Sequence, residues 1–260
     1  MEKDNSKAAE NELFSAKLLG GSKLVDCSQM IQPGCFSYVS CFYKNGEYNK
    51  ESIVDSRTEE KEKFGYIKES MKTALDVGTH IDSPMHFFLD GRSIDELKLS
   101  ELICPGVVID VSKKCIENPE YLLTIEDIKE WETKYGEIPK RALVSMKTGK
   151  GAKFNNIKEY IGTDNPLKEK SIFPGFSVEA AQYLLEKVSE VVAIGIDTAS
   201  LDVSSTIDFP VHRLWLGSGR YMVENMNLES VPESGLKFVL LPLNIKGAVE
   251  CTTRVLAVID

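Results

Sequence analysis

From residue 106 onward, short apolar runs alternate with longer polar segments along the chain. The runs are rich in Val, Ile and Leu and are bounded by turn-forming or charged residues, which is the pattern of buried strands. The predicted strands cover residues 106–111, 142–146, 191–197, 238–243 and 255–259. Ordered structure is expected to begin earlier, at Lys23-Leu24-Val25-Asp26.

Two of the intervening segments carry apolar residues at helical spacing. A capping Thr124 and a stop signal at Gly136 bound the first predicted helix, and Ser177 can cap the second. The apolar faces consist of Ile125, Ile128 and Trp131 in the first and of Val178, Ala181, Leu184, Leu185 and Val188 in the second.

This order of elements predicts an α/β fold. Strands outnumber long helices, so a simple doubly wound sheet fits poorly. Pro242 lies inside a strand-like run and predicts an edge or a bulge, because proline cannot donate to a strand ladder. No linker rich in Gly, Pro or Ser divides the chain, so we expect an N-terminal lead-in over residues 1–20 and a single domain over 21–260. Residues 44–70 are predicted to form a long polar excursion, part loop and part strand.

Composition and charge narrow the class of protein. The chain has 260 residues, of which 42% are hydrophobic, and its formal net charge is -9. A negative surface disfavours binding to nucleic acid and to anionic lipid, since both need basic side chains. No apolar run approaches the roughly 20 residues that span a bilayer, and the first seven residues lack the apolar core of a signal peptide.

The six cysteines form neither a CxxC pair nor a dense framework. This pattern predicts free thiols in a reducing compartment, and therefore a cytoplasmic protein. The cysteines are Cys27, Cys35, Cys41, Cys104, Cys115 and Cys251.

All three histidines of the chain lie in two short segments that also contain acidic residues. The first segment holds Asp76, His80, Asp82 and His86, which would share one face of a straight strand. Asp76 and His80 would then be about 13 Å apart at the usual rise of roughly 3.3 Å per residue, too far to chelate one ion comfortably. A bend is therefore expected, and Gly78 is a natural place for it.

Within this segment, His80 and Asp82 can converge on one ion without distortion. Pro84 ends the strand, so His86 is presented from a turn. A mixture of His nitrogen and Asp oxygen ligands suits Zn²⁺ or Mn²⁺, with His86 placed to carry a proton. The alternative for this segment taken alone is a turn with two ordinary hydrogen-bonded histidines.

The second segment contains His212, which follows Pro210, and Glu224, which ends the apolar run 221–223. A strand or turn carrying His212 and a second element carrying Glu224 would be able to face the first segment. The alternatives are a core histidine satisfied by a backbone carbonyl and a surface carboxylate at the end of a strand.

The eleven residues from Asp76 to His86 resemble the signature of the metal-dependent cyclase family, His-x-Gly-Thr-His-x-Asp-x-Pro-x-His. That family includes bacterial-type kynurenine formamidase and isatin hydrolase. His212 and Glu224 match its spacing, and further similar segments lie at 25–28, 106–110, 173–177 and 194–202. The resemblance implies a swivelling β/β/α domain with a mixed, strand-rich central sheet or barrel-like core, assembled as a homodimer or homotetramer.

The resemblance also implies roles for the site residues. His86 would be the general acid/base, and one or two ions of Zn²⁺ or Mn²⁺ would be bound by Asp76, His80, Asp82, His212 and Glu224. Two positions depart from the family pattern. Asp76 replaces a histidine, which favours Mn²⁺ or another oxygen-preferring ion. Lys150 stands where many members have tryptophan, which predicts the loss of an aromatic wall of the substrate pocket.

We therefore expect a metal-dependent hydrolase that cleaves a small amide with metal-activated water. The substrate would be an arylformamide such as N-formylkynurenine, or a cyclic amide. The alternative is a catalytically silent metal-binding or interaction protein that keeps the fold. Asp76 favours this alternative, whereas the retention of the other five site residues favours the enzyme.

Overall fold

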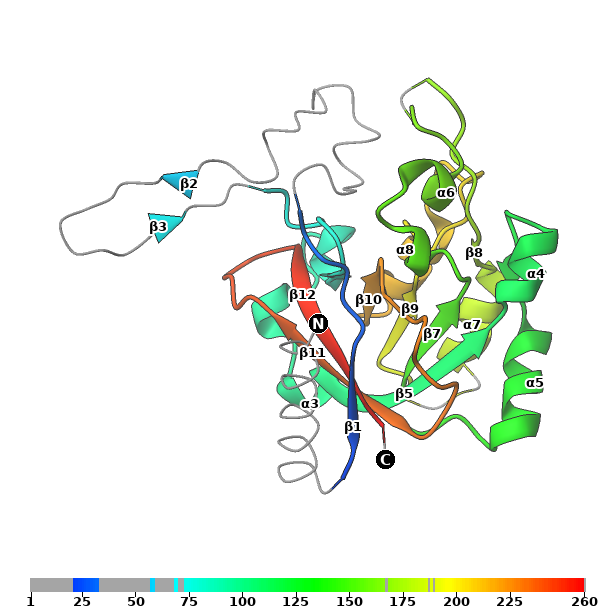
Figure 1. The fold of residues 1–260 in the computed structure, drawn as a ribbon. Helices are drawn as coiled ribbons and strands as arrows, with labels where there is room; N and C mark the ends of the chain where they lie inside the picture. The colour runs from blue at the N-terminus through cyan, green and yellow to red at the C-terminus, as the bar shows by residue number, and fades with distance from the viewer. Residues whose placement is uncertain are drawn as a thin grey trace, which may run out of the picture.

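A closed ring of paired strands forms the centre of the protein (Figure 1). In the computed structural model, the order around this barrel is β12 (Glu250–Ile259), β11 (Leu236–Pro242), β5 (Ile103–Asp110), β7 (Leu143–Lys147), β9 (Ala193–Ile196), β10 (Tyr221–Glu224) and β4 (His80–Asp82). The ring closes because β4 also pairs with the first residues of β12. The last residues of β12 pair with β1 (Lys23–Asp26).

The structure describes residues 21–32, 73–166, 168–186, 188 and 190–259, together with the backbone of 57–58 and 68–69. The predicted lead-in over residues 1–20 lies outside the described residues, as do Cys35, Cys41 and most of the excursion over 44–70. Of that excursion, the short strands β2 (Arg57–Thr58) and β3 (Lys68–Glu69) are described, and they pair antiparallel.

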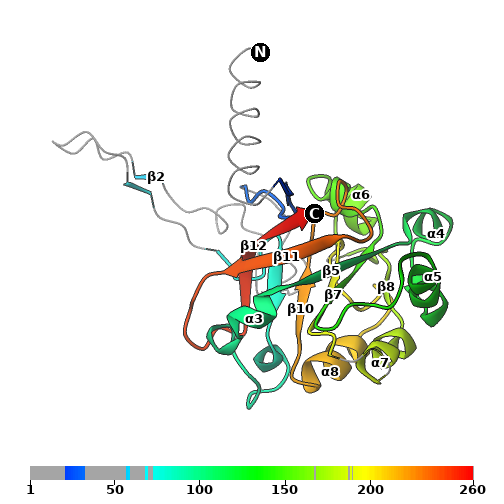
Figure 2. The same ribbon diagram turned by 90° about the horizontal axis from the view of Figure 1, so that it is seen from below.

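The barrel mixes parallel and antiparallel pairs. Strands β5, β7, β9 and β10 run parallel to one another, and all other pairs in the ring are antiparallel. Parallel neighbours need crossover connections, and helices supply them. Figure 2 shows α4 (Ser112–Glu117), α5 (Ile125–Tyr135), α7 (Val178–Glu186) and α8 (Pro210–Gly217) on the outer side of these strands.

The remaining elements are short and lie in the connections. They are the 3-10 turns η1 (Pro84–His86), η2 (Ile94–Glu96) and η3 (Gly151–Lys153), the helices α3 (Leu99–Leu102) and α6 (Ile157–Ile161), and the paired strands β6 (Leu122–Leu123) and β8 (Gly175–Phe176).

The parallel strands are buried on both faces. Val107 and Ile109 of β5 belong to the core under the helices, together with Trp131. Val108, between them, belongs to the core inside the barrel, together with Phe238. Burial on both faces explains why the predicted strands over 106–111, 142–146 and 191–197 are continuous apolar runs rather than alternating ones.

The predicted α/β class with a mixed, barrel-like core is confirmed. The two predicted helix starts are also found. Thr124 Oγ1 accepts a hydrogen bond from Asp127 N at 3.2 Å, and Ser177 Oγ accepts one from Ala180 N at 3.0 Å. Gly136 ends α5 with a φ of 91°, a conformation that favours glycine.

The interpretation of Pro242 as a sign of an edge strand or a bulge is wrong for the strand as a whole. β11 lies inside the sheet, and its register with β12 is continuous up to the pair Pro242 and Thr253. On its other side, however, β11 pairs with β5 only from Leu236 to Val239. Pro242 therefore lies beyond the β5 ladder, where its missing N–H costs no strand hydrogen bond.

Two expectations from composition can be compared with the described residues. Four cysteines there are free and buried, namely Cys27, Cys104, Cys115 and Cys251. No helix in the described ranges is both long enough and apolar enough to cross a membrane.

The two leucines of β6 give a matched test of the helix-side core. Leu123 is fully buried, whereas its neighbour Leu122 is 39% exposed. We predict that Leu123→Ala lowers the free energy of unfolding by about 2–5 kcal/mol, because it removes buried methyl groups and leaves a cavity. Leu122→Ala should cost much less. Urea unfolding monitored by circular dichroism measures both, and equal losses would contradict this description of the core.

Candidate functional site

The strand β4 is the part of the barrel that builds the site. All three of its residues are buried. Its register with β10 places His80 opposite Glu224, and its register with β12 places Asp82 opposite Glu250. Because side chains alternate along a strand, His80 and Asp82 share one face, while Ile81 points into the barrel core.

The chain bends immediately before β4, as the sequence predicts. Gly78 has a φ of 67°, which glycine adopts without strain. Thr79 links the bend by hydrogen bonds to the residue that follows β10 and to β12. Its Oγ1 donates to Asn225 O at 2.6 Å, and its carbonyl accepts from Thr253 N at 2.9 Å. Asp76, before the bend, is 3% exposed and lines the same cavity as His80.

His212 lies in the first turn of the helix α8, so the prediction of a strand or turn at this position is wrong. Pro210 occupies the first turn, where a missing N–H is tolerated. The distant Asp202 accepts hydrogen bonds from the next two amides, Val211 N at 2.8 Å and His212 N at 3.1 Å. A short helix capped by a residue from another segment leaves little local pattern in the sequence.

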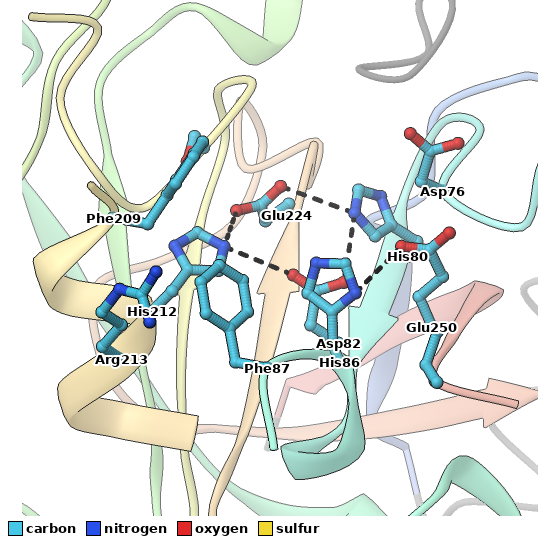
Figure 3. Close-up of a pocket in the computed structure, with 12 residues that line it drawn as sticks. Asp76, His80, Asp82, His86, Phe87, Phe209, His212, Arg213, Glu224 and Glu250 are labelled. Atoms are coloured by element: carbon cyan, nitrogen blue, oxygen red, sulfur yellow. Dashed lines mark ion pairs between the residues drawn. The ribbon is translucent and has the colours of Figure 1, made fainter. Parts of the chain in front are cut away.

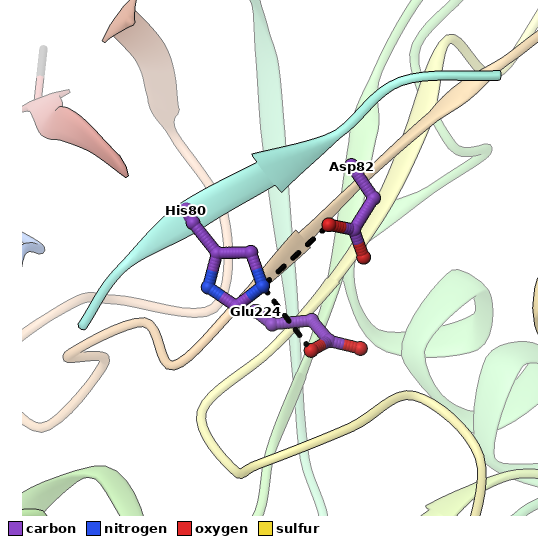
Figure 4. Close-up of side chains that lie close together, drawn as sticks. All are labelled: His80, Asp82 and Glu224. Atoms are coloured by element: carbon purple, nitrogen blue, oxygen red, sulfur yellow. Dashed lines mark ion pairs between the residues drawn. The ribbon is translucent and has the colours of Figure 1, made fainter. Parts of the chain in front are cut away.

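Two imidazoles and two carboxylates face one another at the floor of the site (Figure 3), and Figure 4 shows one of these imidazoles, His80, between Asp82 and Glu224. His80 Nε2 lies 3.5 Å from Asp82 Oδ1 and 3.5 Å from Glu224 Oε2. His212 Nε2 lies 3.6 Å from Asp82 Oδ2 and 3.2 Å from Glu224 Oε1. All four side chains are at most 5% exposed.

The second nitrogen of each imidazole is held by another partner. His80 Nδ1 lies 2.9 Å from Gly78 O, and His212 Nδ1 lies 2.6 Å from Asp202 Oδ2. Such outer contacts fix the ring orientation and keep the proton of a neutral imidazole on Nδ1. Both Nε2 atoms are thereby available as ligands on the side of the two carboxylates.

The donor atoms fit a divalent cation. The ligand atoms of His80, Asp82 and Glu224 lie within 4.8 Å of one another. Asp82 Oδ1 is buried and accepts no hydrogen bond from any described residue. A buried carboxylate oxygen without a donor is costly, and a cation would satisfy it. Two nitrogen and two oxygen donors suit Zn²⁺ or Mn²⁺.

The charges around His80, His212, Asp82 and Glu224 also favour a bound cation. Burial alone lowers the pKa of His80, but Asp82, Glu224 and Asp76 outweigh it and raise this pKa to about 10. Burial likewise opposes a charge on His212, yet its contacts with Asp202, Asp82 and Glu224 raise its pKa well above the ordinary value. The pKa of Asp82 is lowered despite burial, because His86 and His80 favour its charged form. The carboxylates therefore stabilise positive charge at this place, on the imidazoles or on a bound cation.

His86 stands beside this floor on η1, where Pro84 begins the turn as predicted. Its Nδ1 lies 3.4 Å from Glu250 Oε2, and its side chain is 31% exposed. The ligand atoms of Asp82, His86 and Glu250 form a second group within 4.8 Å. Burial raises the pKa of Glu250 to about 7, and the charges of Asp82 and Asp76 add to the effect.

A cavity of about 480 Å³ connects these groups. It is lined by all six residues that the sequence singles out, namely Asp76, His80, Asp82, His86, His212 and Glu224. Phe87 and Phe209 form aromatic walls, with ring centroids 5.9 Å apart, and Arg213 lies at the Phe87 ring at 5.5 Å. Lys150 is not among the described residues that line this cavity, so the expected loss of an aromatic wall at that position stays a prediction.

The sequence reasoning missed two carboxylates that contact the histidines. Asp202 has a recognisable signal, because it lies ten residues before His212 and ends the segment 194–202 that resembles the family. Glu250 has none, because it reaches His86 through the pairing of β12 with β4, across more than 160 residues of sequence.

The fold and site agree with the comparisons to known proteins. Residues 25–203 match the family described as "Putative cyclase", which is more than half of the chain, and the protein belongs to this family. Isatin hydrolase from Roseibium aggregatum is 29% identical over 262 residues, covering 95% of both chains. Kynurenine formamidase from Bacillus mycoides is 27% identical over 191 residues, covering 72% of this chain and 78% of that protein.

The protein is also similar in three dimensions to a solved structure. An isatin hydrolase bound to the product analogue thioisatinate superimposes with a TM-score of 0.80 at 26% identity. The match covers 98% of each chain. The two chains therefore share the same fold.

The contact between Asp202 and His212 generates a prediction about ion binding. Asp202→Asn should weaken the binding of Zn²⁺ or Mn²⁺ by about 10–100-fold, because the carboxylate orients His212 and increases its basicity. Asp208→Asn makes the same change of charge at an exposed position nearby and should leave affinity unchanged. Titration against a competing chelator measures both. Unaltered affinity in Asp202→Asn would show that the contact with Asp202 does not orient His212 as a metal ligand.

Proposed function

We propose that the protein is a metal-dependent hydrolase that cleaves a small amide with water. The observation that carries this proposal is the buried set of two imidazoles and two carboxylates, in which Asp82 Oδ1 accepts no hydrogen bond from the part of the chain that the structure describes. This set lies at the floor of a cavity large enough for a small molecule. Relatives in sequence are named isatin hydrolase and kynurenine formamidase.

In this proposal His80, Asp82, His212 and Glu224 hold the ion, and Asp76 adds a carboxylate from the edge of the same cavity. The cofactor is Zn²⁺ or Mn²⁺, in one or two copies. When bound, such an ion lowers the pKa of water and polarises a carbonyl oxygen. Asp202 and Gly78 O keep the two imidazoles in the ligating orientation.

His86 is the proton carrier of the proposal. It lines the cavity without belonging to the buried group of four, and its partial exposure lets it reach both water and substrate. His86 takes the proton of the attacking water as the new C–O bond forms. It returns that proton to the nitrogen as the C–N bond breaks, leaving an amine and a carboxylic acid, which then releases its own proton to water.

The walls of the cavity favour a flat substrate. Phe87 and Phe209 meet edge to face, and either ring can stack on an aromatic amide. An arylformamide such as N-formylkynurenine and a cyclic amide such as isatin both meet this description. A location in the cytoplasm, a homodimeric or homotetrameric assembly, and one hydrolase domain over residues 21–260 stay predictions.

The alternative is a catalytically silent metal-binding protein with the same fold. The observation that favours it is Asp76, which replaces the first histidine of the family signature and takes no part in the two close ligand groups. Binding of an ion without hydrolysis of any amide would support this alternative.

Separate substitutions distinguish the ligand from the proton carrier. His80→Ala should abolish tight metal binding, because it removes a donor to the ion. His86→Ala should keep the metal but lower turnover by about 10²-fold or more, the usual range for a general acid/base. Metal analysis and arylformamide hydrolysis measure the two effects. If His86→Ala loses the metal as completely as His80→Ala, the assigned roles are wrong.

Restoring the family histidine tests Asp76. If Asp76 is a ligand, its hard oxygen favours Mn²⁺, and Asp76→His should shift the preference toward Zn²⁺, which prefers imidazole. The ratio of the two metals retained after dialysis against an equal mixture measures this shift. An unchanged ratio and stoichiometry would remove Asp76 from the ligand set.

A further inference from the structure

One acidic side chain of the cavity has no role in the function proposed above. Glu250, the first residue of β12, directs Oε2 to within 3.4 Å of His86 Nδ1 (Figure 3). Its side chain is 17% exposed, so most of it is enclosed by the cavity. A carboxylate that is largely removed from water needs a donor or a positive charge as partner.

The backbone fixes the two side chains relative to each other. Ser83, immediately before η1, donates from its N–H to Val249 O at 2.9 Å and from its Oγ to the same oxygen at 2.7 Å. His86 N donates back to Ser83 O at 2.9 Å. Glu250 follows Val249 directly, so the turn carrying His86 is fastened to the residue next to its partner.

We propose that Glu250 is a positioning residue for His86, which rests on the proposed role of His86 as the proton carrier. Glu250 accepts the Nδ1–H of His86 and thereby leaves Nε2 as the nitrogen that takes up the proton. A neutral imidazole has one donor and one acceptor nitrogen, and a carboxylate beside Nδ1 selects the form protonated there.

Two rings lie close to the His86 imidazole. The Phe87 ring lies edge-on to His86, with centroids 5.2 Å apart, and the His212 ring lies 6.4 Å away. The Phe87 ring has no hydrogen-bond acceptor for Nδ1, and both nitrogens of His212 face Asp202, Asp82 and Glu224 instead. Glu250 is therefore the group that sets the direction of the His86 ring.

The small number of histidines makes the tautomer of His86 directly measurable. Long-range ¹H–¹⁵N correlation spectra of the full chain, labelled at histidine and supplied with diamagnetic Zn²⁺, contain three imidazoles, and His86→Asn assigns one of them. Under conditions in which His86 is neutral, we expect its Nδ1–H form to predominate. Glu250→Ala should shift it toward the Nε2–H form, and Glu250→Gln, which keeps an acceptor oxygen, should largely restore it.

Kinetics and metal analysis supply the second part of the test. Glu250→Ala should lower kcat for arylformamide hydrolysis by about 10- to 100-fold, a part of the general acid/base effect, with little change in KM or bound metal. Glu229→Ala, at an exposed position, is the matched control and should change nothing. A Glu250→Ala protein with an unaltered His86 tautomer and an unaltered kcat would overturn the proposal.

Two other outcomes have distinct meanings. Loss of a bound ion in Glu250→Ala would overturn the positioning role and assign Asp82, His86 and Glu250 to a cation site instead. A tautomer that responds to Glu250→Ala in a protein that hydrolyses no amide would support the pairing and contradict the proposed function.

Discussion

The pairing of β4 on both of its edges is the constraint on which the site depends. A strand of three fully buried residues needs partners for its N–H and C=O groups on both sides, and β10 and β12 provide them. The same pairing closes the barrel. It also sets His80 beside Glu224 and Asp82 beside Glu250. The register that gives the backbone of β4 its hydrogen-bond partners therefore also brings the side chains of the site together.

This assembly concentrates negative charge in a place with little water. Asp76, Asp82, Asp202 and Glu224 are each at most 4% exposed, whereas Arg213, which also lines the cavity, is exposed. Buried carboxylates need positive charge nearby, which is why the pKa of His80 is raised. In the proposed function, protons and a metal ion would compete for the same imidazole nitrogens, so binding of an ion should release protons and become stronger as pH rises.

Local features of the site could be predicted from the sequence, and features that depend on long-range pairing could not. The bend at Gly78, the turn after Pro84 and the shared face of His80 and Asp82 follow from neighbouring residues. The helix that carries His212 could not be predicted in this way, because its cap comes from Asp202. Glu250 was missed because only the closing of the barrel brings it to β4.

The same distinction between local and long-range features applies to the fold. Apolar runs and capping residues such as Thr124 identified strands and helices, because burial and capping act over a few residues. The closed order of the barrel rests on pairs such as β12 with β4, whose residues are far apart in sequence. The resemblance to a known family supplied the barrel-like core that the pattern itself left open.

Anomalous diffraction from crystals of the untreated protein, recorded at the manganese and zinc absorption edges, tests the central claim most directly. The account predicts a metal peak among the Nε2 atoms of His80 and His212 and the carboxylates of Asp82 and Glu224. A well-ordered site without such a peak after incubation with either metal would contradict it.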